Sequence, residues 1–309
     1  MLTSERWVKG NTHTHSTISD GDAPPERVAE IYRTLGYGFC YLTDHDKQAP
    51  MDLFRKLSDS RFLFLPGEEL TPESGDFAVH VNALGVERAL TAIREGKSAL
   101  TAQRNAQRVR DAGGLPQLNH PSCVLSDPDT VRLMGSPSLI EVYNHGVAQE
   151  GLGLMAQSLF EGAWNTGLDA GLTMWGVAAD DAHHYTRKDK GANPPGGGWV
   201  MVRVPRLTAE EVLNALRRGR FYSSTGVSVQ SYRVRGNQIE VRVQPKPGVR
   251  YTVELITTLP EHRRKAEGDR VRLEAPTATP WARVRVVGSD RTMAWLQPIW
   301  RGRPVALQW

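Results

Sequence analysis

The sequence predicts an α/β fold in which parallel strands gather into a barrel, followed by a smaller domain of antiparallel strands. In residues 1–226, short and almost continuous apolar runs alternate with segments of helical periodicity, which is typical of parallel strands buried on both faces. Ionisable side chains stand at or just after the ends of those runs. In residues 227–309 the segments alternate in polarity, turns separate them, and no long helix is expected.

Seven strands are expected in the first part of the chain. The clearest helix follows the first strand, where Val28, Ile31 and Leu35 recur at helical spacing after Pro24 and before Gly36. Because the carboxyl ends of barrel strands converge on one mouth, side chains at these ends are expected to meet. The expected strands are Trp7–Thr14, Gly38–Thr43, Phe62–Leu65, Phe77–Leu84, Leu115–Leu118, Leu139–Tyr143 and Leu172–Ala179, and the expected helices are Pro24–Leu35, Met51–Leu57, Ala99–Ala112 and Leu154–Leu168.

The chain is expected to divide at residue 226. Before that point, Trp199–Val204 reads as a strand and Thr208–Arg218 as a helix with a threonine N-cap. Gly196–Gly198 lacks the strand-to-helix context of a phosphate loop and is expected to be a plain connector. We therefore predict one domain over residues 1–226 and a small antiparallel β domain over residues 227–309, packed on the first.

Composition narrows the class of protein. Of the 309 residues, 39% are hydrophobic and 23% are charged, which is ordinary for a soluble globular chain. The 38 basic residues include 30 arginines, but they are dispersed and the net charge is only +4, so nucleic acid is not an expected partner. Cys40 and Cys123 show no disulfide spacing, and no signal-like or membrane-spanning apolar stretch occurs. A cytoplasmic location without membrane contact is expected.

His13 and His15 are separated by one residue at the end of the first expected strand. Side chains alternate along a strand, so both rings point the same way and can hold one divalent ion. Asp20 follows in a Ser-Asp-Gly turn, and other strands end in further candidates. The nine candidate metal ligands are His13, His15, Asp20, His45, Glu69, His80, His120, Asp181 and His183.

The chemistry of these donors indicates a hydrolase. Six imidazoles and three carboxylates suit zinc, manganese or iron, and a set without thiolates disfavours a closed structural zinc site. Nine donors exceed the needs of one ion and fit two or three ions that share a bridging carboxylate. Metal ions about 3.5–4 Å apart can hold a hydroxide between them and clamp the oxygens of a phosphoester. Metal-dependent hydrolysis is therefore the expected reaction class.

Some of these candidates stand beside a second acidic residue. Glu68 and Glu69 are adjacent, so strand alternation lets only one face the barrel, and Glu68 is expected in solvent. Asp44 can orient a neighbouring ligand rather than bind metal, and Asp180 can do the same beside Asp181 or act as a cap. Three of the candidates also have simpler structural alternatives, a turn residue for Asp20 and core histidines for His80 and His120.

Further polar residues near the strand ends have open roles. Two of them, Glu141 and Asn144, can support a ligand from behind. The others can contact substrate at the mouth, but a cap, a turn or a solvated loop explains them equally well. These others are His145, His184, Tyr185, Arg187, Lys188, Ser223, Ser224 and Thr225.

The ordered pattern His-x-His, Asp, Thr-Asp-His, Gly-x-Glu, His, His-Pro and Asp-x-His resembles the PHP (polymerase and histidinol phosphatase) superfamily of metallohydrolases over about residues 7–225. That resemblance implies a distorted seven-stranded (β/α) barrel, and it selects Glu69 over Glu68. The segments 79–85, 180–184 and 219–226 are most similar to the branch that includes the carbaryl-hydrolase-like (CehA/McbA) proteins. The ligand sets implied by the resemblance are His13, His15, Glu69 and Asp181 for a first metal, a bridging Glu69 with His80 and His120 for a second, and Asp20, His45 and His183 for a third.

The expected function is a metal-dependent phosphoesterase acting on a small phosphomonoester or phosphodiester through a metal-bridged hydroxide. Glu69, His45 and His183 are the expected catalytic residues. The alternative is hydrolysis of a carbamate, amide or ester at the same centre, and a third possibility is a degenerate barrel that binds metal only for stability or partner recruitment. Lysine or arginine side chains around the mouth would favour the phosphoester, and an apolar pocket would favour the carbamate.

Overall fold

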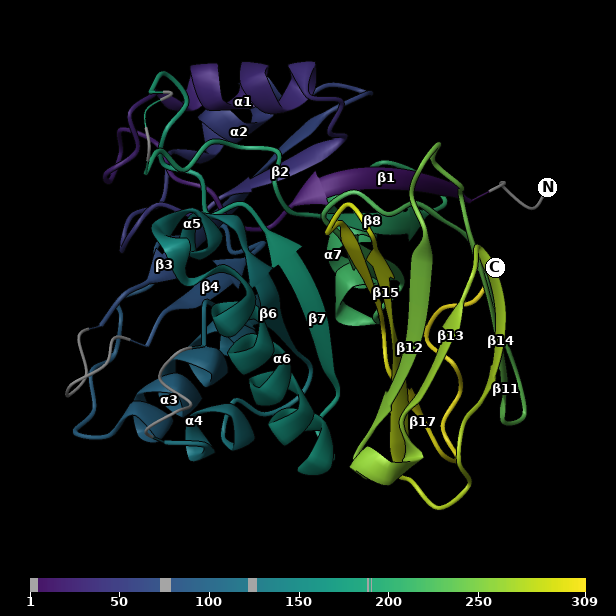
Figure 1. Cartoon of the computed structure of the whole chain (residues 1–309). Helices are drawn as coiled ribbons and strands as arrows, with labels where there is room; N and C mark the ends of the chain where they lie inside the picture. The colour runs from purple at the N-terminus through teal and green to yellow at the C-terminus, as the bar shows by residue number, and fades with distance from the viewer. Residues whose placement is uncertain (1–4, 73–78, 122–126, 188, 190) are drawn as a thin grey trace.

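The computed structural model describes residues 5–72, 79–121, 127–187, 189 and 191–309, and it has a mixed α/β fold. Figure 1 shows an N-terminal part with helices around its strands, beside a C-terminal part made mostly of strands. The N-terminal strands are β1 (Arg6–Asn11), β2 (Phe39–Leu42), β3 (Leu63–Leu70), β4 (Val81–Leu84), β5 (Leu115–Leu118), β6 (Ser138–Asn144), β7 (Met174–Ala179), β8 (Trp199–Val204) and β9 (Phe221–Ser224). The helices are α1 (Pro25–Thr34), α2 (Met51–Leu57), α3 (Ser98–Asp111), α4 (Asp129–Arg132), α5 (His145–Val147), the π-helix η2 (Ala148–Leu152), α6 (Gly153–Asp169) and α7 (Ala209–Arg217).

The order of the strands brings their functional ends together. Strands β1, β2 and β3 run parallel, β4 is antiparallel to both of its neighbours, and β5, β6 and β7 are parallel again. Just beyond the ends of β1 and β7, the amide of Asp181 donates to the carbonyl of His13 at 2.9 Å, and that of His15 donates to Ala182 at 3.0 Å. The sheet therefore curls until its first and seventh strands meet at one end.

Strand β4 differs from the sequence expectation in its start and its direction. It begins at Val81, so His80 precedes the strand instead of lying in its middle; residues 77 and 78 of the expected strand lie outside the described residues. Only residues 71–80 separate β3 from β4, and a parallel crossover needs a dozen or more. The chain therefore returns antiparallel, which places His80 at the same end of the sheet as the carboxyl end of β3.

The expected helices are present, with ends that follow from local chemistry. Helix α1 has Pro25 in its first turn, buries Val28 and Tyr32, and is followed by Gly36 at φ +77°, a conformation that glycine adopts without strain. In α7, the side chain of Thr208 accepts a hydrogen bond from the amide of Glu211 at 3.2 Å, as an N-cap does. None of the described helices is long and apolar enough to cross a membrane.

The C-terminal strands pair in antiparallel fashion. They are β10 (Val229–Arg235), β11 (Gln238–Val243), β12 (Tyr251–Thr257), β13 (Arg264–Glu267), β14 (Arg270–Glu274), β15 (Trp281–Gly288), β16 (Met293–Leu296) and β17 (Ile299–Trp300), with a 3-10 turn at Pro260–His262. A sheet of β10, β11 and β14 packs on the larger one. Because β16 pairs with β9, the larger sheet continues from the N-terminal part; the division at residue 226 stays a prediction.

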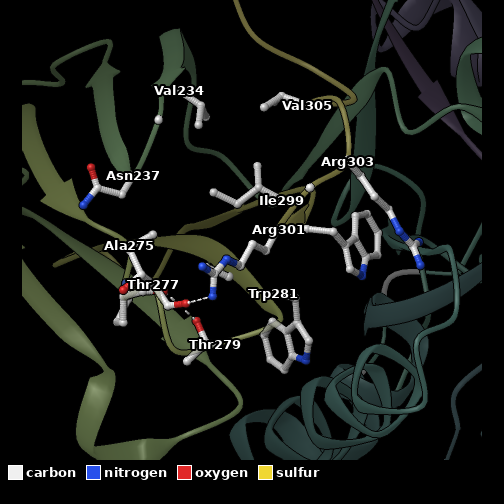
Figure 2. Close-up of a pocket in the computed structure, with 15 residues that line it drawn as sticks. Val234, Asn237, Ala275, Thr277, Thr279, Trp281, Ile299, Arg301, Arg303 and Val305 are labelled. Atoms are coloured by element: carbon white, nitrogen blue, oxygen red, sulfur yellow. Dashed lines mark hydrogen bonds between the residues drawn. The ribbon is translucent and has the colours of Figure 1, made fainter.

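A cavity of about 300 Å³ opens among these C-terminal strands. Figure 2 shows the indole of Trp281 in its wall and the guanidinium of Arg301 turned toward Thr277, whose carbonyl accepts a hydrogen bond from it. None of the candidate metal ligands lines this cavity.

Candidate metal centre

The two histidines after β1 lie side by side and fully buried. His13 Nε2 and His15 Nε2 are 3.1 Å apart. The intervening Thr14 bridges to Ala182 as an isolated parallel pair, and its amide donates to Thr43 Oγ1 at 3.0 Å. The chain thus stays extended past the end of β1, and alternation sends both imidazoles to the same side.

Two carboxylates complete a compact group with these rings. Glu69 Oε2 is 3.2 Å from His13 Nε2 and 3.3 Å from His15 Nε2, and Asp181 Oδ1 is 3.1 Å from each. Both oxygens are buried, and neither accepts a hydrogen bond from any residue that the structure describes. Ligand bonds of zinc-like ions put neighbouring donor atoms about 3 to 3.5 Å apart. The group therefore fits a divalent cation, which would satisfy the two orphaned oxygens.

Electrostatics lead to the same conclusion. Burial alone would lower the pKa of His13, but Asp181, Glu69 and Glu141 raise that pKa well above its usual range. Burial alone would raise the pKa of Glu69, but His13 and His80 hold it well below its usual range. The site is therefore built for negative carboxylates around a positive charge.

Glu69 connects this group to a second one. Its Oε1 is 3.0 Å from His80 Nδ1 and 3.5 Å from His120 Nε2, and its Oε2 is 3.1 Å from His45 Nδ1. His45, Glu69 and His80 are close enough to share an ion. The structure therefore brings His45, as well as His80 and His120, to the predicted bridging carboxylate.

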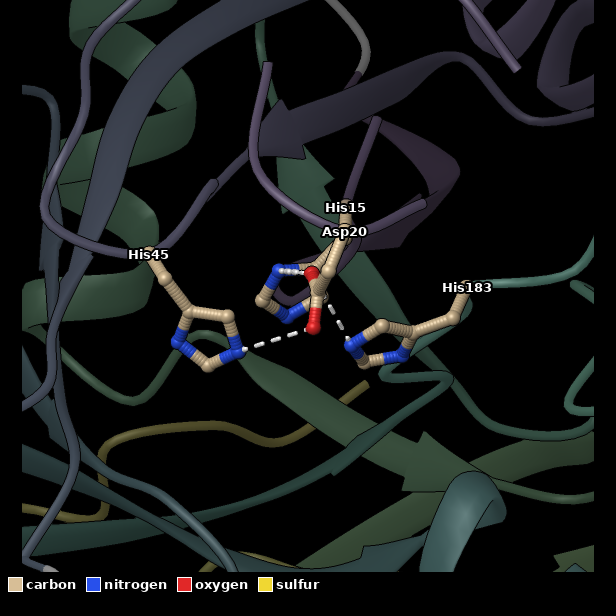
Figure 3. A group of neighbouring side chains, drawn as sticks. All are labelled: His15, Asp20, His45 and His183. Atoms are coloured by element: carbon tan, nitrogen blue, oxygen red, sulfur yellow. Dashed lines mark ion pairs between the residues drawn. The ribbon is translucent and has the colours of Figure 1, made fainter. Parts of the chain in front are cut away.

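A third group surrounds Asp20 at the rim (Figure 3). Asp20 Oδ1 is 3.6 Å from His15 Nδ1 and 3.5 Å from His183 Nε2, while Oδ2 is 3.6 Å from His45 Nε2. Its side chain is 53% exposed, in contrast to the buried ligands. Burial would raise the pKa of Asp20, but His183, His15 and His45 lower it. All nine predicted ligands thus fall into three adjoining groups, and their assignment to individual ions stays a prediction.

Glu141 and Asn144, whose roles the sequence left open, lie directly behind the ligands. Glu141 Oε1 accepts from His13 Nδ1 at 2.7 Å, and Oε2 accepts from the amide of His120 at 2.6 Å. Asn144 donates to Glu141 Oε2 at 2.8 Å and to Asp181 Oδ2 at 3.1 Å. His120 and Asp181 have positive φ angles of 24° and 51°, a strained backbone of the kind found at functional sites. The hydrogen bonds from the His120 amide to Glu141 and from Asn144 to Asp181 hold this backbone in place.

Asp44 holds the loop that carries Asp20. Its Oδ1 accepts from the amides of Ser16 and Ser19 at 2.8 and 3.1 Å, and its Oδ2 accepts from Ser16 Oγ at 2.8 Å. Asp44 therefore acts through the loop backbone, while its neighbour His45 faces the cluster. Asn119 donates to Glu69 Oε1 at 2.8 Å. Asn119 was assigned no role from the sequence, and its position directly before His120 was the one sign that it lies near the cluster.

Glu68 corrects one expectation. It is fully buried instead of solvated, and its Oε1 accepts from the amide of Leu90 at 2.5 Å. Alternation does turn it away from Glu69, but the segment after β4 covers that face. Burial raises the pKa of Glu68 to about 7.

Asp180 also faces away from the cluster. The amides of Gly197 and Gly198 donate to its Oδ1 at 2.8 and 2.9 Å, and Tyr32 donates to its Oδ2 at 2.9 Å. The glycine connector therefore wraps an internal carboxylate and fastens the chain after β7.

Other polar residues with open roles do not join the cluster. His145 contacts Tyr143 OH at 3.1 Å, and His184 Nδ1 accepts from the amide of Asn193 at 3.0 Å. Ser224 is buried and donates to the carbonyl of Val227 at 2.8 Å. Lys188 lies outside the described residues.

An apolar cavity of about 330 Å³ adjoins the ligands. His120 and Asp181 form one wall, and Glu150 is the one other charged residue in its described lining. Met155, on the facing helix α6, has 63% of its surface exposed. The remaining lining residues are Val147, Ala156, Leu159 and Phe160. This apolar lining was not predicted from the sequence, because apolar residues at helical spacing are equally typical of a helix that packs into the protein core.

No family model and no curated protein matches the sequence. Among solved structures, the chain is similar to a two-domain protein from Bacteroides vulgatus that contains a predicted PHP-like metal-dependent phosphoesterase, with 18% identity over 93% of this chain and 91% of that one and a TM-score of 0.50. It is less similar to an amidohydrolase from Chromobacterium violaceum with bound sulfate and no metal, with 16% identity over 60% and 93% of the two chains and a TM-score of 0.44. At these identities the likeness concerns the fold.

Proposed function

We propose that the chain is a metal-dependent hydrolase that acts on a small phosphomonoester or phosphodiester. The observation that carries this proposal is the buried group of four residues, His13, His15, Glu69 and Asp181. Two of its carboxylate oxygens, Glu69 Oε2 and Asp181 Oδ1, have no hydrogen-bond partner among the described residues, and a bound cation would satisfy both. Bound divalent ions activate water and stabilise negative charge on reacting oxygens. The resemblance of the ordered motifs to the PHP superfamily supports the same proposal, as does the meeting of β1 and β7, which fits the distorted barrel of that superfamily.

The residues of the cluster divide by exposure. His13, His15 and Glu69 are buried, so they do not contact substrate directly. Their role is to hold ions, and Glu69 contributes to catalysis through the ions that it bridges. The side chains of His45 and His183 are 27% and 21% exposed at the rim. These two histidines can therefore contact a substrate and exchange a proton with it, in addition to serving as ligands. Asp20, more exposed still, lies between them.

A second candidate function, hydrolysis of a carbamate, amide or ester, is favoured by the apolar cavity beside His120 and Asp181. A phosphoester carries negative charge and is best held by cationic side chains. The described lining offers Glu150 and no lysine or arginine, which suits a neutral, apolar substrate. The narrower similarity to carbaryl-hydrolase-like proteins supports this candidate.

A hydrolysis screen separates the two candidates. Enzyme reconstituted with Mn, Zn or Fe is assayed on aryl phosphomonoesters, aryl phosphodiesters, aryl carbamates and aryl esters, with Asp181→Ala as the inactive control. Turnover of phosphoesters that rises in Glu150→Gln supports the first candidate, because a repulsive charge has been removed. Turnover of carbamates or esters that Glu150→Gln leaves unchanged supports the second. No turnover of any of the four classes contradicts the hydrolase proposal.

A further inference from the structure

A further cavity, lined mainly by charged residues, lies between α6 and the strands β12, β13 and β15. Its volume is about 310 Å³, and it shares no lining residue with the metal centre. One face of α6 contributes Ser158, Glu161, Gly162 and Asn165, whose spacing of three and four residues places them on one side of the helix.

Arg283 belongs to this cavity's wall, and its guanidinium is buried. The residue is 1% exposed, Nη2 donates to Glu161 Oε2 at 2.8 Å, and Nε donates to Asn165 Oδ1 at 3.0 Å. Nη1 is buried and has no hydrogen-bond partner among the described residues, and the guanidinium lies over the ring of Trp164, with Cζ 4.7 Å from the ring centroid. A buried guanidinium with one donor unmet is unfavourable unless another acceptor is supplied.

The two carboxylates of the lining are already occupied. Glu161 accepts from Arg283 and also, through Oε1, from Arg285 Nη1 at 2.6 Å and Trp295 Nε1 at 3.1 Å. Glu254 accepts from Arg285 Nε at 2.8 Å and pairs with Lys265 Nζ at 2.6 Å. Neither carboxylate is therefore free to satisfy Arg283 Nη1.

Positive charge is left over at the opening. Arg263 and Arg264 are exposed, line the cavity and make no ion pair with a carboxylate among the described residues. Glu161 and Glu254 are the two acidic residues of the described lining. The five cations of that lining are Arg263, Arg264, Lys265, Arg283 and Arg285.

Gly162 lies at the opening of the cavity and is exposed. A Cβ placed on this residue would meet no atom within 4 Å. A larger side chain at this position therefore has room to extend into the opening.

We propose that this cavity binds a small phosphate-type oxyanion with at least two negative charges, held by the exposed guanidinium groups of Arg263 and Arg264 at its opening. Guanidinium groups bind such oxyanions through paired, charge-assisted hydrogen bonds. The anion is either inorganic phosphate itself or the phosphoryl group of a larger molecule. The site is independent of the metal centre and of the reaction proposed there.

The test is calorimetric titration of the metal-loaded protein with inorganic phosphate and with pyrophosphate at constant ionic strength. We expect a binding event that Gly162→Met abolishes by filling the cavity, with no loss of thermal stability because methionine favours helix. A double variant, Arg263→Gln with Arg264→Gln, should weaken the same event by about tenfold or more. Arg242→Gln, which removes an exposed arginine of β11 outside the cavity, should leave it unchanged.

The variants also distinguish this site from phosphate bound by metal ions. Phosphate bound only at the metal centre would give the same isotherm in the wild type, in Gly162→Met and in the double arginine variant, and that result overturns the proposal. Absence of any phosphate or pyrophosphate binding in the wild type overturns it as well. Stronger binding of pyrophosphate than of phosphate indicates that the cavity takes the phosphoryl group of a larger molecule.

Discussion

Glu141 accepts a hydrogen bond from His13 Nδ1 at 2.7 Å, and both side chains are fully buried. A carboxylate at Nδ1 keeps the proton on that nitrogen, so Nε2, which faces His15 and Asp181, is the nitrogen available to a metal ion. The same carboxylate accepts from the amide of His120 at 2.6 Å. Glu141 thus holds two of the candidate ligands, His13 and His120, from a buried position.

The first prediction concerns this residue. Glu141→Gln should lower metal affinity by about 10- to 100-fold, because the amide is a weaker acceptor and removes a negative charge behind His13. Equilibrium dialysis against a metal buffer measures the change. Glu274→Gln, an exposed substitution on β14, is the control. Equal affinity in the wild type and both variants would show that Glu141 is only a packing residue.

The second prediction compares the adjacent glutamates with a histidine ligand. Glu69→Ala should lose more metal and more turnover than His15→Ala. Glu69 contacts at least one histidine of each group, namely His15, His45 and His80, and its negative charge separates neighbouring cations. Glu68→Ala should keep its metal, since Glu68 faces Leu90 instead. Metal analysis of the three variants checks the order. Loss of metal from Glu68→Ala alone would mean that the strand register is wrong by one residue.

The third prediction concerns Asp20, the most exposed member of the cluster. Asp20→Ala should lower bound metal by one ion and leave the quartet around His13 occupied, because Asp20 makes no contact with Glu69 or Asp181 that the quartet needs. Elemental analysis and thermal unfolding are measured on the same sample. Unchanged metal content with a lower melting temperature would reduce Asp20 to a turn residue.

The fourth prediction is a dependence of stability on pH. Burial alone would raise the pKa of Glu161, but Arg283 and Arg285 hold it at about 2. A carboxyl group with a depressed pKa in the folded state stabilises the fold above its unfolded pKa of about 4.3, and this contribution is lost as pH falls toward 2. The difference in unfolding free energy between wild type and Glu161→Gln should therefore shrink between pH 5 and pH 2. Denaturant titrations across this range measure it, and a constant difference would contradict the assignment.

Sequence alone predicted which candidate ligands lie together more readily than it predicted their surroundings. Candidate ligands such as His13 and His15 follow strand ends, where period-two alternation and short apolar runs fix both position and direction. Glu68 was misplaced because alternation says which way a side chain points, not whether another segment covers that face. His80 was placed in the middle of a strand, but β4 begins only at Val81 and returns antiparallel, because the connection from β3 is too short for a crossover.

The cavities lay beyond sequence reasoning for a different reason. Glu161 and Arg283 are far apart in the chain, and their pairing at 2.8 Å exists only because β15 packs near α6. Met155 and Leu159, four residues apart, have the helical spacing of core residues, and only the fold places them beside Asp181. Such contacts depend on tertiary packing, which local periodicity does not encode.

The central claim is that this chain assembles a multinuclear metal centre, and elemental analysis of the purified protein tests it most directly. Protein grown with added manganese, zinc and iron should carry two or three divalent ions per chain, because eight of the nine predicted ligands form three adjoining groups that could each hold an ion, and buried oxygens of Glu69 and Asp181 have no hydrogen-bond partner among the described residues. Asp181→Ala should lose at least one of these ions. At most a trace of metal in the wild-type protein under these conditions would contradict the account.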